Sequence, residues 1–563
     1  MRRNTVLQLA ATIAVALLAS VAVSAAGLPA PAGPGTLQFR ISFPAEANPG
    51  PLDGRVFVII SKDAGSEPKD DVDVTGVPLW GKEISGAMPG QIMTISSGDP
   101  DVDGYPIADI SGIPAGDYFV QAFFTIYTTY HRADGHTVKL PASTGGGGPL
   151  AMFSTPGNLK SKAEKMHIDP ASKAPVNLSL SQAMPGLPAE GSGQVAQQGN
   201  YADTDMVKYV KIQSKLLSDF WGQPMYIGAN ILLPRTYASH PEAHYPVWYQ
   251  QGHWPGGRPP LRYGQGRSID KFWASEQCPQ MIVVEIRDEN PYYDTSYSIN
   301  SANLGPYGDA IMTELIPYIE SNFRAIPQAW ARLLSGGSTG GWEALALQVW
   351  RPDSFGGTWP LCPDSGDFSY FQLINIYKDA NAYYTEYEWT QVERPSARAT
   401  DGNIKFTVKQ ENDWERALGP GNKSGGQWSV WEAVYGPVGP DGYPARIWDP
   451  ITGVINKDVA AFWKENFDIR YKLEKEWATI GPKLVGKIHI RVGDMDNYYL
   501  NNGVYKIQEF LEATKDPYYD GCVKCFPRLG HTGNITNEEL LAEMAEHLTK
   551  HAPEGALGTL WLK

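Results

Sequence analysis

A serine flanked by glycines is the feature of this sequence that points most clearly to chemistry. Gly336 to Gly340 form the pattern G-x-S-x-G around Ser338, behind the short apolar stretch 333–334. The following residues, 343–350, predict a helix. Strand, tight turn and helix are the context of a nucleophile elbow, where the serine hydroxyl projects from a strained turn. The pattern predicts that Ser338 is a nucleophile; the alternative is a glycine-rich connection in a parallel sheet.

The expected base is a histidine, because a serine hydroxyl is a poor nucleophile until its proton is taken. On a sheet with a nucleophile elbow, the acid and then the histidine follow the serine in the chain. The histidines after Ser338 are His489, His531, His547 and His551. The first lies in a predicted strand, and the last two lie in or at the end of the predicted C-terminal helix, 537–550. His531 lies in a loop just after the last predicted strand and is the expected base.

The expected acid follows the predicted strand 487–492. Two aspartates lie there, Asp494 and Asp496, and Asp496 has the G-x-x-D spacing from Gly493 that favours it. Asp364, which follows an earlier strand, is a third candidate. The chosen carboxylate should orient the imidazole and stabilise its cation.

An oxyanion hole needs two N–H donors aimed at the developing negative charge. The backbone N–H of Thr339, directly after the serine, is expected to be one. The other is expected from the loop after the predicted strand 245–249, as the amide of His253 or Trp254. His253 precedes the serine, which is the wrong place for the catalytic base.

Composition limits the classes of function. The 563 residues are too many for one ordinary domain, and 42% of them are apolar, enough for large cores. Aromatic residues make up 11%; they suit sugar or aryl ligands but are also ordinary core residues. The net charge of −14 argues against nucleic acid or an anionic membrane as a partner.

The N-terminus resembles a secretory signal peptide. Arg2 and Arg3 precede the largely apolar segment 6–23, and 23–25 or 24–26 fits a small-x-small cleavage site. A signal peptide over 1–26 predicts a secreted or periplasmic protein, with an uncleaved anchor as the alternative. No later apolar stretch is long enough to span a bilayer, so no integral span is expected after cleavage.

The chain changes character after a Gly- and Pro-rich stretch. Residues 36–185 contain short strand-like runs separated by turns, which predicts an accessory β-sandwich-like domain. Residues 186–204 are expected to be a linker. In 205–563, strands alternate with helices, which predicts a mainly parallel sheet flanked by helices. The alternation of strands and helices stops at about 366–470. This aromatic-rich stretch is interpreted as an insertion that caps the sheet.

No pattern calls for a metal ion or an organic cofactor. The cysteines are Cys278, Cys362, Cys522 and Cys525. The last two face opposite sides of a predicted strand and lack a second C-x-x-C for zinc, so free thiols or remote disulfides are expected. Residues 99–104 resemble the start of a calcium loop, but Ile110 stands where a glutamate ligand is required.

The region from about 207 to 550 resembles the putative-esterase branch of the α/β-hydrolases. That branch includes esterase D, feruloyl and enterochelin esterases, and the antigen 85 acyltransferases. The matching segments are 214–217, 233–237, 305–307, 314–317, 336–341 and 493–500, with His531 last. Segments 290–294, 362–364 and 496–500 are also similar to a group of large secreted bacterial members with a β-rich N-terminal region.

The resemblance implies an α/β-hydrolase fold and a triad of Ser338, Asp496 and His531, with no cofactor. The site residues and the resemblance together predict a secreted carboxylic-ester hydrolase that acts through an acyl-enzyme on a small-molecule or polysaccharide-linked ester. The aromatic-rich insertion suggests an aryl or carbohydrate-linked ester, but it has no match in the small family members, so the resemblance leaves the substrate open. Acyl transfer to an alcohol, and an inactive carbohydrate-binding or adhesion protein, are the alternatives. The chain departs from the family where Gln250-Gln251-Gly252-His253 replaces the common His-Gly, which leaves the second oxyanion donor open.

Overall fold

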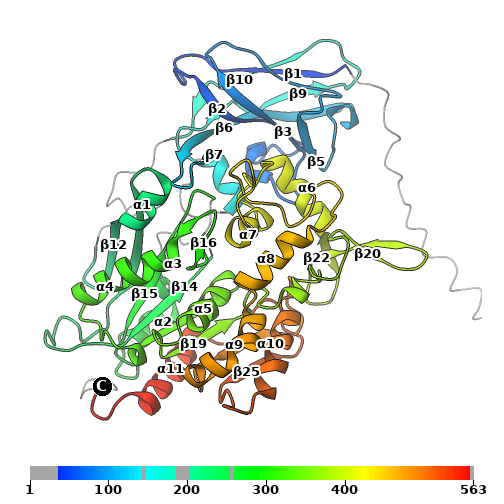
Figure 1. The fold of residues 1–563 in the computed structure, drawn as a ribbon. Helices are drawn as coiled ribbons and strands as arrows, with labels where there is room; N and C mark the ends of the chain where they lie inside the picture. Colours follow the sequence, from blue (N-terminus) through cyan, green and yellow to red (C-terminus); the bar gives the residue numbers. More distant parts are fainter. Residues whose placement is uncertain (1–35, 142–147, 186–202, 254–258, 293–294, 558–563) are drawn as a thin grey trace, which may run out of the picture.

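The computed structural model describes residues 36–141, 148–185, 203–253, 259–292 and 295–557. The expected signal peptide, most of the expected linker and Trp254 lie outside the described residues. A β-rich N-terminal region, blue to cyan, lies over an α/β region that contains the rest of the chain (Figure 1).

The N-terminal region contains two sheets. A three-stranded sheet has the order β10-β1-β4, and an eight-stranded sheet has the order β11-β8-β6-β2-β3-β5, with β7 and β9 also paired to β6. The strands are β1 (Gln38–Ser42), β2 (Leu52–Ser61), β3 (Leu79–Ala87), β4 (Met93–Ser96), β5 (Val102–Tyr105), β6 (Gly116–His131), β7 (Thr137–Pro141), β8 (Leu159–Lys160), β9 (Glu164–Ile168), β10 (Val176–Ser179) and β11 (Gln182–Ala183). Only short 3-10 turns, Pro68–Asp71, Ile110–Gly112 and Gly148–Phe153, interrupt its described residues.

A shared apolar core holds these two sheets together. Phe39 and Ile41 of β1 pack in one cluster with Val56, Val58 and Ile60 of β2. Alternate residues of a strand face the same side, so each strand turns one apolar row toward the other sheet.

The α/β region is built on one mixed sheet with the order β12-β13-β15-β14-β18-β19-β24-β25. The pairs β12–β13 and β13–β15 are antiparallel, and the remaining neighbours are parallel. The strands are β12 (Val207–Ser214), β13 (Met225–Leu232), β14 (Val247–Gln251), β15 (Ile282–Arg287), β18 (Arg332–Gly337), β19 (Gly357–Leu361), β24 (His489–Gly493) and β25 (Cys522–Phe526), besides the short pair β16 (Asn300–Ser301) and β17 (Gly305–Pro306). The carboxyl ends of β18, β19, β24 and β25 therefore meet at one edge of the sheet.

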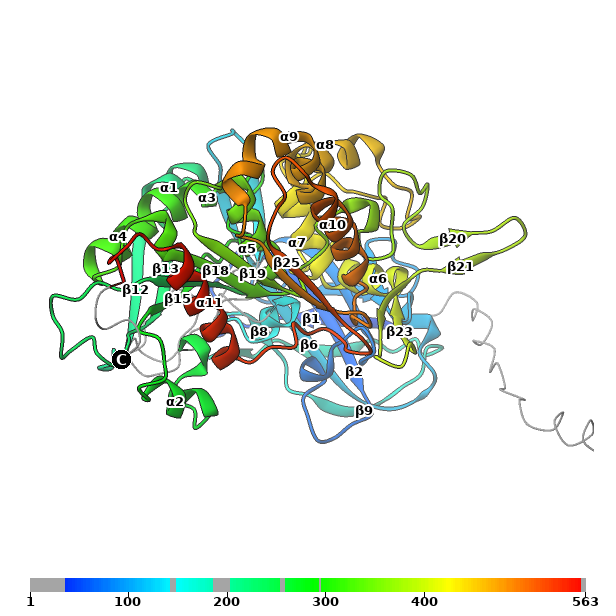
Figure 2. The same cartoon turned by 90° about the horizontal axis from the view of Figure 1, so that it is seen from below.

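Helices cover both faces of this sheet (Figure 2). One face carries α2 (Ser268–Trp273) and α11 (Asn537–His551), which share a core with Trp248 and Trp359. The other face carries α1 (Lys215–Trp221), α3 (Tyr307–Ala310), α4 (Ile316–Asn322), α5 (Thr339–Trp350), α9 (Ile469–Leu484) and α10 (Asn501–Ala513). A π-helical turn, Ile311–Leu315, joins α3 to α4, and 3-10 turns occupy Pro260–Arg262, Ala329–Ala331 and Phe368–Tyr370. Among the described residues, no helix combines the length and apolar character needed to cross a membrane.

The insertion contains helices and two small hairpins. Its helices are α6 (Val408–Leu418), α7 (Gln427–Tyr435) and α8 (Lys457–Phe467), and its strands are β20 (Tyr384–Glu386), β21 (Gln391–Glu393), β22 (Pro395–Arg398) and β23 (Ile404–Thr407). Its aromatic residues are divided between core and surface. Tyr383, Trp414, Trp428, Trp431 and Tyr435 are buried, whereas Tyr387 and Trp389 lie exposed on the hairpin β20–β21, which projects from the molecule in Figure 2. Most of the aromatic content of the insertion therefore stabilises the fold.

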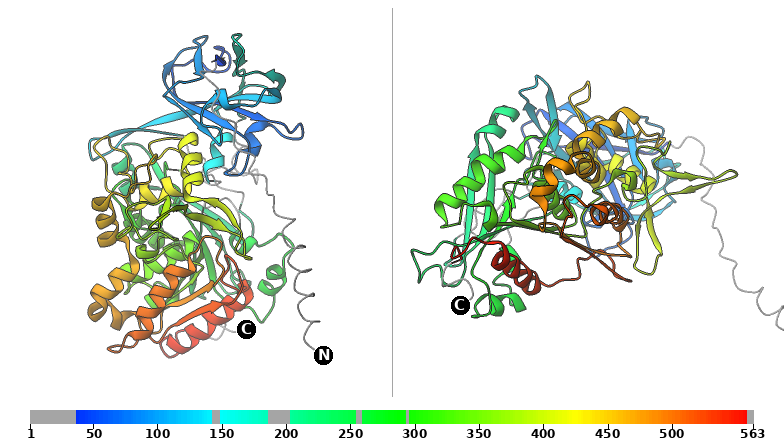
Figure 3. Two further views of the ribbon diagram at one scale, coloured as in Figure 1. Left: turned by 90° about the vertical axis from the view of Figure 1, so that its right-hand side faces the viewer. Right: turned by 60° about the horizontal axis from the view of Figure 1, so that its bottom comes forward.

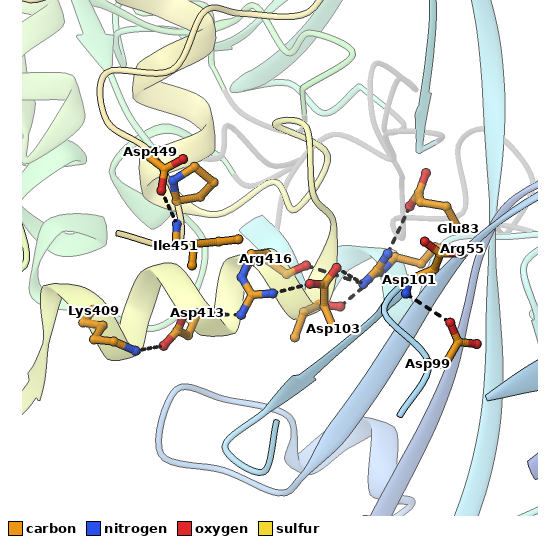
Figure 4. A network of polar contacts seen from close by, with 12 residues as sticks. Arg55, Glu83, Asp99, Asp101, Asp103, Lys409, Asp413, Arg416, Asp449 and Ile451 are labelled. Carbon is orange, nitrogen blue, oxygen red and sulfur yellow. Dashed lines mark hydrogen bonds and ion pairs between the residues drawn. The ribbon is translucent and has the colours of Figure 1, made fainter. Parts of the chain in front are cut away.

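Ion pairs join the N-terminal region to the insertion. Seen from another side, the N-terminal sheets, in blue, lie over the yellow part of the chain that contains α6 (Figure 3). Arg55, buried in β2, donates to the Ala417 carbonyl at 3.1 Å and to Asp103 at 3.2 Å (Figure 4). Arg416 of α6 also contacts Asp103. Asp103, in the segment that resembles a calcium loop, thus accepts from Arg55 within the N-terminal region and from Arg416 across the contact.

The N-terminal region also contributes to the core of the α/β region. Tyr130 of β6 and Val138 and Leu140 of β7 belong to the large cluster that contains the face of the sheet carrying α5. The rings of Tyr130 and Trp221 meet edge to face, 5.1 Å apart between centroids. The two regions are therefore packed as one unit and share buried apolar surface.

Candidate active site

Ser338 lies in the strained turn between β18 and α5. Its backbone has φ 58° and ψ −125°, a conformation that a residue with a side chain rarely adopts. A Cβ on Gly340 would lie 2.4 Å from the Gln251 carbonyl oxygen, and one on Gly336 would lie 2.3 Å from the Gly340 oxygen. The glycines of the G-x-S-x-G pattern are thus required because strand, helix and the end of β14 approach closely.

His531 and Asp496 form a hydrogen-bonded pair in the loops after β25 and β24. His531 Nδ1 lies 2.6 Å from Asp496 Oδ2, and Asp496 is fully buried. The other carboxylate oxygen accepts the N–H groups of Tyr498 and Leu500 at 2.9 and 3.2 Å. These bonds fix the carboxylate, which in turn holds a proton on Nδ1, so that the neutral ring carries its lone pair on Nε2.

The hydroxyl of Ser338 does not reach the imidazole in this structure. It donates instead to Asp364 Oδ1 at 3.3 Å. His531 Nε2 lies 3.9 Å from the sulfur of Cys362, the residue directly after β19. Serine, histidine and aspartate are therefore brought to one edge of the sheet, with Asp364 and Cys362 beside them.

Asp364 is the most heavily bonded carboxylate of the site. Its Oδ2 accepts from the hydroxyls of Thr339 and Tyr297 at 3.0 and 3.1 Å, and from Trp431 Nε1 at 3.2 Å. Burial raises the pKa of the Asp364 carboxyl, against the opposing influence of His253, these hydrogen bonds and His531.

Electrostatics favours the protonated form of His531. Burial alone disfavours the charged ring, but the hydrogen bond to Asp496 and the adjacent sulfur of Cys362 outweigh it and raise the pKa of His531. The Tyr498 and His531 rings lie perpendicular to each other, 5.2 Å apart between centroids. Tyr498 therefore packs against the imidazole of His531.

The rival acid and base candidates lie elsewhere or make other contacts. Asp494 accepts the backbone N–H of Arg528 at 2.6 Å and so braces the loop that leads to His531. His489 stacks on Trp359 on the face of the sheet covered by α11. His547 lies 2.9 Å from the Gly356 carbonyl, and His551 lies at the end of α11.

The structure describes two of the three expected oxyanion donors, Thr339 and His253. Thr339 is buried at the first position of α5, directly after the serine. The close contact of Gly340 with Gln251 and Gly252 brings the loop that carries His253 beside the elbow. Trp254 lies outside the described residues.

Sequence reasoning missed the neighbours of Ser338 and His531. The sequence indicates Asp364 only as an alternative acid, and Cys362 only as a free thiol or disulfide partner. Both follow β19, which is the neighbour of β18 in the sheet. The strand order would have placed them beside the elbow, but their individual contacts depend on side-chain packing.

The sequence pattern of a family described as putative esterases matches residues 222–516, more than half of the chain. The chain belongs to this family. The family is one of esterases, and residues 222–516 contain most of the mixed sheet with its covering helices.

Similar proteins include an endo-1,4-beta-xylanase/feruloyl esterase from Xylanibacter ruminicola. It is 29% identical over 133 residues, which cover 23% of this chain and only 18% of that relative. Similar solved structures include a ferulic acid esterase (TM-score 0.34, 16% identity, 61% of this chain and 96% of that one). An S-formylglutathione hydrolase from Agrobacterium tumefaciens gives TM-score 0.35 and 13% identity over 62% of this chain and 97% of its own.

Proposed function

We propose that the protein is a secreted serine carboxylic-ester hydrolase that uses Ser338, His531 and Asp496. The observation that carries the proposal is a strained serine at a strand–helix turn, next to strand ends that hold a hydrogen-bonded His–Asp pair. Strain of this kind persists only where the surrounding structure over-determines it, and it concentrates at functional sites.

The proposed reaction begins with rotation of the Ser338 hydroxyl. Its Oγ leaves Asp364, turns about the Cα–Cβ bond and donates to Nε2 of His531. Catalytic hydrogen bonds that are long in a free enzyme commonly tighten only when substrate binds. The serine oxygen then attacks the ester carbonyl while His531 takes its proton.

Formation and breakdown of an acyl-enzyme complete the cycle. The Thr339 N–H and a second N–H from His253 or Trp254 stabilise the oxyanion. His531 returns its proton to the departing alcohol, and then deprotonates the water that hydrolyses the acyl-enzyme. Asp496 keeps the imidazole in the required tautomer throughout.

We propose an aryl or carbohydrate-linked ester as the substrate, and a location outside the cytoplasm. Support for the substrate comes from the feruloyl-esterase name of the matched relative and from the partly exposed Tyr498 ring beside His531. The buried aromatics of the insertion give no support, because they are occupied in packing. Support for secretion is the N-terminal sequence alone.

The test is release of acid from methyl ferulate and from acetylated xylan, with Ser338→Ala as the matched control. We expect turnover on at least one ester by the wild type and none by the variant. Product analysis with added alcohol separates hydrolysis from acyl transfer. No turnover by the folded wild type on an ester panel would contradict the proposal.

A further inference from the structure

The nitrogen of His531 that the proposed reaction needs lies beside a thiol. Cys362 Sγ is 3.9 Å from Nε2, while Asp496 Oδ2 is 2.6 Å from Nδ1 on the other side of the ring. One ligand atom from each of these three residues lies within 4.8 Å of the others. Cys362 and Asp496 are buried, and His531 is partly exposed to solvent.

Sulfur and imidazole nitrogen are the ligands that zinc and cadmium prefer. With a metal–sulfur bond of about 2.3 Å and a metal–nitrogen bond of about 2.05 Å, tetrahedral geometry separates the two ligand atoms by about 3.6 Å. The observed separation is 3.9 Å, so a shift of about 0.3 Å would fit the metal between them. A side-chain torsion readily supplies a movement of that size.

The surroundings of the pair also suit a cation. Histidines that bind zinc usually donate their other N–H to a carboxylate, which fixes the ring and strengthens the ligand. Asp496 occupies that position. The buried Asp364 carboxylate accepts the Ser338 hydroxyl at 3.3 Å, so both residues place oxygen atoms at the same strand ends.

We propose that Cys362 and His531 Nε2 bind a single thiophilic divalent cation of the zinc class, with Asp496 orienting the histidine from behind. Binding releases the thiol proton of Cys362 and the Nε2 proton of the protonated His531 ring to solvent, and the thiolate sulfur and Nε2 replace two water molecules on the metal. The inhibitory consequence rests on the proposed function: the metal takes the lone pair that would accept the Ser338 proton, so the occupied enzyme is inactive.

Cadmium tests binding separately from activity, because a cadmium–thiolate bond absorbs in the ultraviolet. The chelator-treated, full-length mature protein is titrated with Cd²⁺ as wild type, Cys362→Ala and Cys522→Ala. Cys522 is the matched control, since it lines a separate cavity with His489, His547 and His551. We expect one equivalent of saturable absorption in the wild type and in Cys522→Ala, and its loss in Cys362→Ala.

Zinc inhibition of ester turnover, reversible by chelator, is measured in the same proteins. Removal of the sulfur ligand should raise the inhibiting Zn²⁺ concentration at least about 100-fold. If Cys362→Ala fails to fold, Cys362→Ser replaces it, because a hydroxyl retains the shape without the thiolate absorption. The proposal is overturned if the absorption survives both substitutions, if it disappears instead in Cys522→Ala, or if it never saturates in the folded wild type. If the wild type hydrolyses no ester yet shows the Cys362-dependent absorption, the metal site holds and the proposed function fails.

Discussion

Replacement of Asp496 by asparagine tests the assignment of the acid. Asp496 is fully buried, and its Oδ1 accepts two backbone N–H groups while its Oδ2 lies against His531 Nδ1. Those backbone donors will hold the amide oxygen of asparagine, so its NH₂ group will face the imidazole. A donor at that position forces the proton onto Nε2, and His531 then cannot accept the proton of Ser338.

We expect Asp496→Asn to lower kcat/KM by about 10⁴-fold, as expected when a catalytic histidine is held in the wrong tautomer. The assay is nitrophenolate release from 4-nitrophenyl acetate, together with a thermal melt to show that the variant is folded. Asp494→Asn is the matched control. Its carboxylate braces only the Arg528 backbone, and an amide oxygen can still accept that bond, so activity should stay near wild type. A large loss in Asp494→Asn with a mild effect of Asp496→Asn would refute the reasoning.

Three further predictions concern packing and titration. Gly340→Ala places a Cβ 2.4 Å from the Gln251 oxygen and should lower the free energy of unfolding by about 1–3 kcal/mol, measured in denaturant; unchanged stability would refute the close packing. Burial and the neighbouring Glu415 raise the pKa of Glu411 from 4.5 to about 7 in the folded protein. The contribution of this carboxyl to the free energy of unfolding is therefore complete below pH 4.5 and is lost as the pH rises through 7. Glu411→Gln, which mimics the protonated side chain, should gain up to about 3 kcal/mol over wild type between pH 5 and 8.5; a pH-independent difference would contradict this. A fragment of residues 203–563 lacks Tyr130, Val138 and Leu140, and each missing side chain removes about 1.5–3 kcal/mol of stabilisation from its core. We expect that this fragment does not melt cooperatively. A cooperative melt would show that the two regions fold separately.

The arrangement of the catalytic sheet could be predicted in outline from the sequence. The predicted strands 245–249 and 487–492 became β14 and β24 with ends shifted by one or two residues. A short apolar run rich in β-branched or aromatic residues favours a buried strand over a buried helix, because helices are usually longer. The antiparallel β12 and β13 were not expected, since strand direction depends on pairing partners far along the chain.

Chain order and spacing were sufficient to predict that the expected site residues lie at one edge of the sheet. Ser338, Asp496 and His531 lie after β18, β24 and β25, and the roles assigned to them remain predictions. The contacts that distinguish this site, Ser338 with Asp364 and His531 with Cys362, could not be predicted. They depend on which strands are neighbours and on the rotamers that packing allows.

Aromatic composition was the least informative signal. The insertion looked suited to aryl or sugar ligands, but an abundance of tryptophan does not say whether the rings are exposed. Trp428 and Trp431 pack with Phe371 in an edge-to-face cluster. Trp389, by contrast, is 89% exposed on a projecting hairpin. Large rings stabilise cores as readily as they bind ligands, so only their burial separates the two uses.

The central claim is that Ser338 is an activated nucleophile, and fluorophosphonate labelling tests it most directly. Intact mass is measured after treatment of wild type, Ser338→Ala and Cys362→Ala, each shown to be folded. We expect a single adduct on the wild type and on Cys362→Ala, and none on Ser338→Ala. An adduct that persists in Ser338→Ala, or no adduct on folded wild type, would contradict the account.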